Sequence, residues 1–446
     1  MAKKKAPPSN VVPIGGGPDP AIAGVLDARD LLGLRLNDKR KPIGCLENVV
    51  TLLLTQKEWQ GVLAFNELSL AIEKRQAPPF ECGVLGEWTD KDDNEARLWF
   101  SEKFDVRVPV ADVAAGASIV AGRNTYHPIR EYLDGLTWDG TARLATWLQR
   151  YLGAEAPRDD ARTPEYYQKA GAWWLTSAVA RIYAPGAKAD HVLLLEGEQG
   201  IGKSSALSIL FGDWFSDTPL RIGDKDSYGA LRGVWCIELA ELDSLNRAES
   251  SASKALFSSR VDKYRPPYGH RDIQAPRQCV FAGTVNHDEY LRDSTGNRRY
   301  WPVRCTELRL RGPDSLEEVR DQLFAEAVAA YRAGAPWYPQ TSDDKELFRE
   351  QQAARELGDV YEDMIRTYVA NKSEISMREI FEDCLNTEPA KMTRAEQSRV
   401  GEVMKKLGWR KRRESTGRRS YIYVRPRDAT AAEPGEEFEG GIDVPF

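Results

Sequence analysis

A glycine-rich stretch in the middle of the chain has the residue types and spacing of a phosphate-binding loop. Gly197, Gly202, Lys203 and Ser204 fit the pattern G-x-x-x-x-G-K-S. Glycines let the backbone N–H groups surround phosphates, Lys203 supplies a point charge for the β- and γ-phosphates, and the Ser204 hydroxyl is a ligand for Mg²⁺. We therefore expect ATP and Mg²⁺ at the nucleotide-binding residues Gly197, Glu198, Gln199, Gly200, Ile201, Gly202, Lys203, Ser204 and Ser205.

Two acidic residues follow a later apolar run, "VWCIELAEL". An ATPase needs carboxylates at a second strand end, to hold Mg²⁺ and to polarise the attacking water. We assign Glu238 to the Mg²⁺ side and Glu241 to the activation of water, and the two roles could be exchanged or shared. The alternative interpretation is an ordinary surface acid after a strand.

Two further motifs that could serve nucleotide hydrolysis follow these acids in the sequence. Asn286 ends the apolar run "CVFAGTVN" and could orient the attacking water, although Asn is also common in turns. Arg298 and Arg299 stand between a Gly-Asn turn and the apolar run "YWPV", where one of them could stabilise transition-state charge. If that arginine reaches a neighbouring subunit's nucleotide, hydrolysis requires a ring. The alternative for this pair is an ordinary surface position.

The elements that must position these residues are alternating strands and helices. Four apolar runs between residues 190 and 305 ("HVLLLEG", "VWCIELAEL", "QCVFAGTVN" and "YWPVRC") alternate with helical segments. Buried strands that alternate with helices indicate a parallel α/β sheet. We expect a disordered leader (1–20), a mostly helical N-terminal domain (25–155), an ATPase domain (156–345), a C-terminal winged-helix domain (360–427) and an acidic disordered tail (428–446).

Composition excludes several classes of protein. The 446 residues contain no apolar run long enough for a membrane span, and no apolar stretch follows the basic N-terminus as in a signal peptide. Six cysteines and four histidines are scattered without a CxxC pair, which disfavours a zinc site or a disulfide framework and favours a reducing cytoplasm. The net charge of −6 conceals an asymmetry, since residues 391–427 hold thirteen Lys or Arg against three Glu.

The stretches "GEQGIGKSS", "ELAELDSL", "APRQCVFAGTVN" and "LRDSTGNRRYWPV", in this order and spacing, resemble the virulence-associated protein E family. The upstream stretch "TYHPIREYLDGLTWDGTARL" also looks like that family, so the resemblance covers roughly residues 120–340. It implies an AAA+ core similar to superfamily-three helicases, in ATPases of phages, prophages and mobile islands. It further implies a hexameric, DNA-translocating ATPase for replication of a mobile element in a bacterial host cytoplasm. Some relatives carry a primase, which the N-terminal block here does not resemble.

Two basic regions are candidates for DNA binding. The first lies where related helicases carry a pore hairpin, and its basic and aromatic residues suit phosphates and unpaired bases. The second is the C-terminal unit, whose pattern of helix, helix and basic hairpin suits a winged helix. The alternatives are a solvated loop for the first and a protein-contact domain for the second. The candidates are Lys254, Lys263, Tyr264, Arg265, Tyr268, His270 and Arg271 in the first region, and Arg394, Arg399, Arg412, Arg413, Arg418 and Arg419 in the second.

The function that these features favour is an ATP-dependent DNA helicase or translocase, acting as a homo-oligomeric ring, with a hexamer favoured. Single-stranded DNA would pass through the pore, and duplex DNA could meet the winged helix. The alternative is a DNA-binding ATPase switch, a regulator or antiviral effector without unwinding. A small-molecule kinase is disfavoured, because it needs neither a ring arginine nor a DNA module. Membrane partners are not expected.

The acidic tail ends in apolar residues: Asp443, Val444, Pro445 and Phe446 close the chain. This ending resembles the C-terminal tip of bacterial single-strand DNA-binding proteins, in which Phe docks in a pocket and its carboxylate meets a basic residue. We expect the tail to recruit host replication proteins that read that tip. The alternative is an acidic tail that binds nothing.

Removal of Val444–Phe446 tests this expectation, because the truncated chain lacks both the Phe side chain and the terminal carboxylate at the position that the pocket reads. We expect binding to those host proteins, measured by calorimetry, to be lost while ATP hydrolysis is retained. Unchanged binding would show that the tail has no such role.

Overall fold

The computed structural model describes residues 33–80, 83–156, 160–220, 226–240, 247–264, 272–286, 297–355, 360–387, 392–413 and 421–425. The chain divides into two compact units, and the division falls after Arg355. Each unit has its own hydrophobic core. Within the described ranges, no helix is both long and apolar enough to span a membrane.

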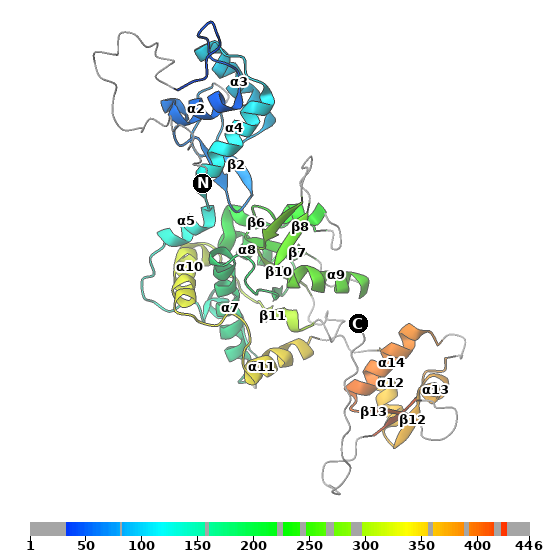
Figure 1. Cartoon of the computed structure of the whole chain (residues 1–446). Coiled ribbons are helices and arrows are strands. Elements are labelled where there is room, and N and C mark those ends of the chain that lie inside the picture. The colour runs from blue at the N-terminus through cyan, green and yellow to red at the C-terminus, as the bar shows by residue number, and fades with distance from the viewer. Residues whose placement is uncertain are drawn as a thin grey trace, which may run out of the picture. The chain divides into compact units, whose positions relative to one another are not determined.

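A parallel sheet of five strands forms the centre of the first unit (Figure 1). Its spatial order is β11-β5-β10-β7-β6, and every neighbouring pair is parallel. The predicted parallel α/β sheet is therefore confirmed, and the four apolar runs became β5, β7, β10 and β11. The strands are β5 (Val192–Glu196), β6 (Phe215–Ser216), β7 (Cys236–Ala240), β10 (Val280–Val285) and β11 (Tyr300–Arg304).

Side chains alternate between the two faces of this sheet along each strand. Both faces are covered by other parts of the first unit. Leu193 and Leu195 of β5 enter the core formed with α7, α8 and α10, whereas Val192 and Leu194 enter a second core with Phe257 of α9. Short 3-10 turns join the elements. The helices are α7 (Thr163–Tyr183), α8 (Lys203–Phe211), α9 (Arg247–Ser258), α10 (Leu316–Arg332) and α11 (Ser342–Ala353). The 3-10 turns include Lys57–Trp59, Gly212–Trp214, Asp226–Leu231 and Asn297–Arg299.

The N-terminal block contains a sheet that the sequence pattern did not reveal. Its four strands are only two to four residues long, too short to show a clear alternation. The expectation of a mostly helical domain over 25–155 therefore missed this sheet, whose order is β3-β2-β1-β4. The elements are α2 (Leu46–Thr55), β1 (Leu63–Asn66), β2 (Ala71–Lys74), β3 (Gly86–Glu87), α3 (Asp90–Phe104), α4 (Val110–Arg123) and β4 (Thr125–Tyr126).

The core of the N-terminal block ends near α4, before the expected boundary at 155. Ile129 and Leu133 of α5 (Pro128–Gly135) and Trp147 of α6 (Trp147–Leu152) belong to the core of the central sheet. The two parts touch where the β1–β2 turn meets the amino end of the central strands. Gln278, just before β10, donates to the Glu67 carbonyl at 3.0 Å, and Leu68 lies in the central core.

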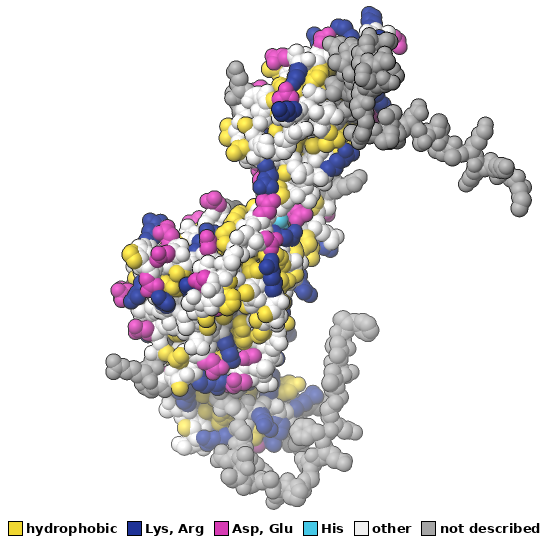
Figure 2. Space-filling model, turned by 90° about the vertical axis from the view of Figure 1, so that its left-hand side faces the viewer, with side chains coloured by type: hydrophobic (Ala, Val, Ile, Leu, Met, Phe, Trp, Pro, Cys, Tyr) yellow, Lys and Arg dark blue, Asp and Glu magenta, His cyan; other side chains and the backbone are white. Residues whose placement is uncertain are grey.

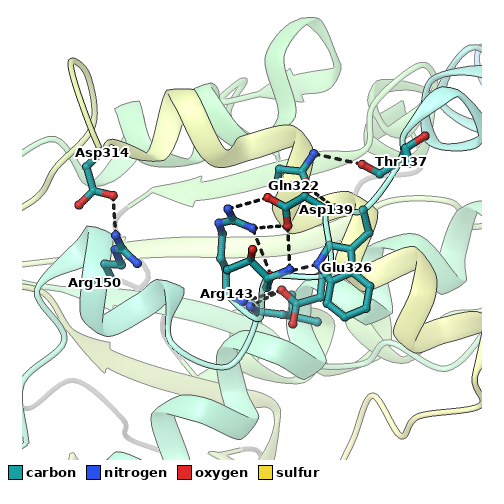
Figure 3. A network of polar contacts seen from close by, with 10 residues as sticks. Thr137, Asp139, Arg143, Arg150, Asp314, Gln322 and Glu326 are labelled. Carbon is teal, nitrogen blue, oxygen red and sulfur yellow. Dashed lines mark hydrogen bonds and ion pairs between the residues drawn. The ribbon is translucent and has the colours of Figure 1, made fainter.

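A surface loop between α5 and α6 is braced by α10 (Figure 3). The Asp139 carboxylate receives both terminal nitrogens of Arg143 at 2.8 Å, and the Asp139 backbone N–H donates to Gln322 at 2.9 Å. Gln322 donates in turn to the Thr137 carbonyl at 3.1 Å. Glu326 accepts the Arg143 backbone N–H at 2.7 Å. The loop is therefore fixed by one helix that also packs on α7.

In the part of the C-terminal unit that the structure describes, three helical segments accompany a three-stranded antiparallel sheet of order β12-β14-β13. The sequence pattern contained the helices and the β13–β14 hairpin, and the structure adds β12, a strand of three residues. Ile365, Phe381, Met404 and Trp409 lie in its core. The elements are α12 (Val360–Val369), β12 (Glu374–Ser376), α13 (Met377–Glu379) continued by a π-helical turn (Ile380–Cys384), α14 (Arg394–Lys406), β13 (Arg410–Arg413) and β14 (Tyr421–Val424).

Replacement of Glu326 by Ala tests the brace of the α5–α6 loop. The backbone N–H groups of Arg143 and Leu144 would lose their shared acceptor, which stands at 2.7 and 2.8 Å. A partly buried donor without an acceptor costs about 1–3 kcal/mol, so we expect a lower midpoint of thermal unfolding. Glu326→Gln should retain most of the stability, because an amide oxygen also accepts.

Glu317→Ala is the matched control on the same helix, because Glu317 is exposed and makes only a 3.9 Å ion pair with Arg311. The brace would be contradicted if the Glu326 and Glu317 variants unfolded at the same temperature in differential scanning calorimetry.

Candidate nucleotide site

The predicted phosphate-binding loop joins the carboxyl end of β5 to the start of α8. Gly202 caps this helix with a φ of +102°, a conformation that side chains other than Gly rarely adopt. Gly197 lies so close to the backbone that an added Cβ would stand 2.6 Å from the Cys305 carbonyl oxygen. These glycines are thus required by backbone conformation and by close approach, as the sequence motif predicts.

Lys203 lies at the centre of the loop. Its Nζ donates to the carbonyl oxygens of Gly197 at 2.6 Å and Glu198 at 2.8 Å, and to the Asn286 side-chain oxygen at 3.2 Å. The residue is only 6% exposed, and this burial lowers the pKa of its ammonium group. The structure therefore brings together Lys203 and Asn286, which are far apart in the sequence.

Glu238 lies beside Ser204, as expected for a shared Mg²⁺ site. Its Oε1 accepts hydrogen bonds from the Ser204 hydroxyl and the Thr284 hydroxyl, both at 2.7 Å. Glu238 is 4% exposed, and its Oε2 is buried without a hydrogen-bond partner. Thr284 was not among the predicted site residues, although its place near the end of the "CVFAGTVN" run was the available signal.

These oxygens fit Mg²⁺. Mg²⁺ prefers hard oxygen ligands, and it is commonly held by one or two protein groups together with phosphate oxygens and waters. The Ser204 hydroxyl and the unpaired Oε2 of Glu238 supply such groups. Among the described residues, no set of three or more His, Cys, Asp or Glu forms a metal site, so a metal held by protein ligands alone is not indicated there.

Arg298 and Arg299 lie at the opposite edge of the sheet from the loop. They form the 3-10 turn before β11, and β11 runs parallel to β5 with Tyr300 opposite Val192 and Arg304 opposite Glu196. At about 3.3 Å per residue, the strand from Tyr300 to Arg304 spans about 13 Å. This separation keeps both guanidinium groups away from their own chain's phosphate loop.

The two arginines differ in their surroundings. Arg299 is partly buried and donates through Nε and Nη2 to the Ser258 hydroxyl at 3.1 and 2.9 Å. Arg298 is exposed. The sequence alone did not distinguish them, whereas the structure gives Arg299 a partner on α9 and presents Arg298 to solvent.

The first basic region is a hairpin of β8 (Val261–Tyr264) and β9 (Ile273–Pro276). Its base is anchored by a buried ion pair, in which Arg277 donates through Nε to Asp262 at 3.0 Å. Lys263 is exposed on β8, and Lys254 is partly buried on α9. The tip of the hairpin, with Arg265, Tyr268, His270 and Arg271, lies outside the described residues, as does the side chain of Tyr264.

The second basic region includes strand β13, where all four residues, Arg410–Arg413, are exposed. Arg394 at the start of α14 is exposed as well. Arg412 pairs with Glu374 at 2.8 Å, and the Arg399 guanidinium lies over the Tyr361 ring at 4.3 Å. Arg399 is therefore engaged within its own unit. The remaining predicted residues, Glu241, Arg418, Arg419 and Asp443–Phe446, lie outside the described residues.

The face formed by α5 and α10 carries charges of both signs (Figure 2). Arg332 of α10, for example, pairs with Asp134 of α5 at 2.7 Å, so opposite charges lie side by side on these two helices. Nucleic-acid binding requires a patch or stripe of one sign. This face is thus a poorer candidate for DNA than the β8–β9 hairpin or β13.

A buried ion pair at the base of the loop had no sequence signal. Glu196, the last residue of β5, is 1% exposed on its side chain, and its carboxylate accepts Nε of Arg355 at 2.9 Å and Nη2 at 3.1 Å. Arg355 also donates to the Gln351 carbonyl at 3.1 Å. The last residue of the first unit thereby fixes the residue that precedes the phosphate loop.

A search of the curated proteins found no match. Two solved structures of the NrS-1 C-terminal region are similar at 12% identity. Its apo structure has a TM-score of 0.44 and covers 84% of this chain and 98% of that one, and its A form apo structure has a TM-score of 0.43 and covers 85% and 99%.

The family comparison extends over the whole nucleotide site. A family model described as the virulence-associated protein E-like domain matches residues 133–357, slightly more than half of the chain. The matched segment begins within α5 and contains the phosphate loop, Glu238, Asn286 and both arginines. The chain therefore belongs to the virulence-associated protein E-like family of P-loop ATPase domains.

Proposed function

We propose that this P-loop ATPase is an ATP-driven DNA translocase or helicase that acts as a ring, with a hexamer favoured, in the replication of a phage or other mobile element. The observation that carries this proposal is the position of Arg298. It lies at the sheet edge opposite its own phosphate loop, so a catalytic arginine at this position must act on a neighbouring subunit's nucleotide. A ring closes such head-to-tail contacts.

The residues of the nucleotide site divide the chemistry of hydrolysis among them. Lys203 would exchange its bonds to the loop carbonyls for the β- and γ-phosphates, and Ser204 and Glu238 would hold Mg²⁺. Mg²⁺ supplies neutralisation of phosphate charge when it is bound. Asn286, at 3.2 Å from Lys203, orients the attacking water beside the γ-phosphate. Glu241, or Glu238 with it, accepts the proton of that water.

The basic hairpin and the C-terminal unit supply the DNA contacts in this proposal. Lys263 on the β8–β9 hairpin is exposed, and the buried Asp262–Arg277 pair would resist deformation of the hairpin under load. In the C-terminal unit, exposed basic residues of β13 and Arg394 would contact backbone phosphates, as in a winged helix. The tail tip Asp443–Phe446 would recruit host replication proteins.

The rate of ATP hydrolysis with and without single-stranded DNA is the main test. We expect DNA to stimulate the wild-type rate, and Lys203→Ala to lower turnover by about a hundredfold or more, because an electrostatic contact made in the transition state is lost. Lys188→Ala is the control, since Lys188 is exposed and lies over the Tyr338 ring at 4.3 Å. A phosphate-release assay measures all three proteins.

Strand displacement separates the proposal from its alternative. Hydrolysis that is coupled to directional displacement of an annealed strand would support a helicase. DNA binding and ATP hydrolysis without displacement or translocation would instead favour a switch, and would contradict the motor function.

Mixed oligomers test whether the site is shared between subunits. Arg298→Ala should lower turnover by about a thousandfold, the contribution of a transition-state arginine. Arg298→Ala and Lys203→Ala proteins should each hydrolyse ATP very slowly, but together they would form interfaces with one intact loop and one intact arginine, so mixing should restore activity. Arg299→Ala should retain more activity, because that side chain bonds Ser258 in its own chain. Wild-type hydrolysis by Arg298→Ala, or no restoration on mixing, would contradict a shared site.

A further inference from the structure

An open groove of about 580 Å³ runs beside the phosphate loop. One wall is the exposed side of α8, at Ser205 and Ile209, and the other wall is the segment Leu308–Pro313 that follows β11. Ser205 comes directly after Ser204, and Ile209 lies one helical turn beyond it. The groove therefore begins where the phosphate loop ends.

The second wall of the groove is held in place by its neighbours. The Arg309 N–H donates to the Tyr151 carbonyl at 2.8 Å, and the Arg309 carbonyl accepts the Leu316 N–H at 2.9 Å. Asp314, just beyond the segment, pairs with Arg150 at 2.7 Å (Figure 3). The segment is thus fixed on both sides before any ligand binds, and preorganisation of this kind favours affinity.

The same segment touches the phosphate loop. A Cβ added to Gly202 would stand 2.8 Å from Leu310 Cδ1 and 3.9 Å from Leu308 Cδ2. Both leucines are partly buried and pack against the central core, whereas Arg309 and Arg311 between and after them are exposed. The segment therefore offers apolar side chains next to the loop and guanidinium groups at its solvent side.

We propose that this groove binds the purine base of the bound nucleotide, and that it accepts adenine and guanine alike. The proposal rests on the proposed nucleotide binding at Lys203. With phosphates at the start of α8, the nucleoside extends past Ser205, and Ile209, Leu308 and Leu310 supply the apolar contacts that suit a flat ring.

The polar groups of the groove do not distinguish the two purines. Arg309 and Arg311 can donate to N7, an acceptor that adenine and guanine share. Among the described lining residues, no side chain carries a carboxylate or a carboxamide, the groups that pair with the adenine amino group or with the donors of guanine. Strong discrimination between substrates needs such paired polar groups.

Binding of ATP, GTP and inorganic tripolyphosphate to the full chain, measured by calorimetry, tests the groove. We expect ATP and GTP to bind within about tenfold of each other, and both more tightly than tripolyphosphate. Leu308→Ser and Ile209→Ser should each weaken ATP by about tenfold and leave tripolyphosphate unchanged, because only the base loses contacts. Leu98→Ser is the control, at an exposed leucine of α3.

A labelling experiment does not depend on how well these variants fold. Photolysis of wild-type protein with 8-azido-ATP should attach the label within residues 308–313 or at Ile209, as mapped by peptide mass spectrometry. The proposal is overturned if the label lies elsewhere, if ATP binds no more tightly than tripolyphosphate, or if ATP exceeds GTP by more than about a hundredfold. If Lys203→Ala leaves ATP and tripolyphosphate binding unchanged, the proposed phosphate site itself fails.

Discussion

The hydrogen bonds to Glu238 join the parts of the nucleotide site that come from different elements. One carboxylate oxygen accepts Ser204 from α8 and Thr284 from β10, while the carboxylate itself belongs to β7. The strand order makes this possible, because β10 stands between β5 and β7. Thr284 and Asn286 therefore lie between the phosphate loop and the acidic strand. A sheet in which β5 and β7 were neighbours would leave no place for these two side chains.

The two edges of the same sheet carry different parts of the first unit. Its carboxyl edge carries the phosphate loop, whereas its amino edge carries the N-terminal block, the base of the β8–β9 hairpin and the turn with both arginines. Gln278 and Arg232 precede β10 and β7, and they bond the carbonyls of Glu67 and Ser69 in the β1–β2 turn. Strands β7 and β10 thus connect the nucleotide site with the β1–β2 turn of the N-terminal block, whereas β11 begins at the turn with both arginines.

The sequence singles out residues that the structure brings together, such as Lys203 with Asn286 and Ser204 with Glu238, because its motifs are local. The glycines, Lys203 and Ser204 lie within eight residues, and each acid or amide ends an apolar run. Contacts between distant residues left no such pattern. The Glu196–Arg355 pair joins residues 159 positions apart, and the strands of the N-terminal sheet are too short to show a period. The choice between Arg298 and Arg299 likewise depends on Ser258, a residue on another element.

The Glu196–Arg355 pair also determines where the chain can be divided. Arg355 is the last residue of the first unit, yet its guanidinium neutralises a carboxylate next to the phosphate loop. Removal of one partner of a buried ion pair costs about 3–5 kcal/mol, since the other charge remains without compensation. An ATPase fragment that ends even one residue early would lose the guanidinium that neutralises the buried Glu196 carboxylate, next to the loop that binds a polyanion. Its weak nucleotide binding would then reflect the cut itself, not the absence of the C-terminal unit.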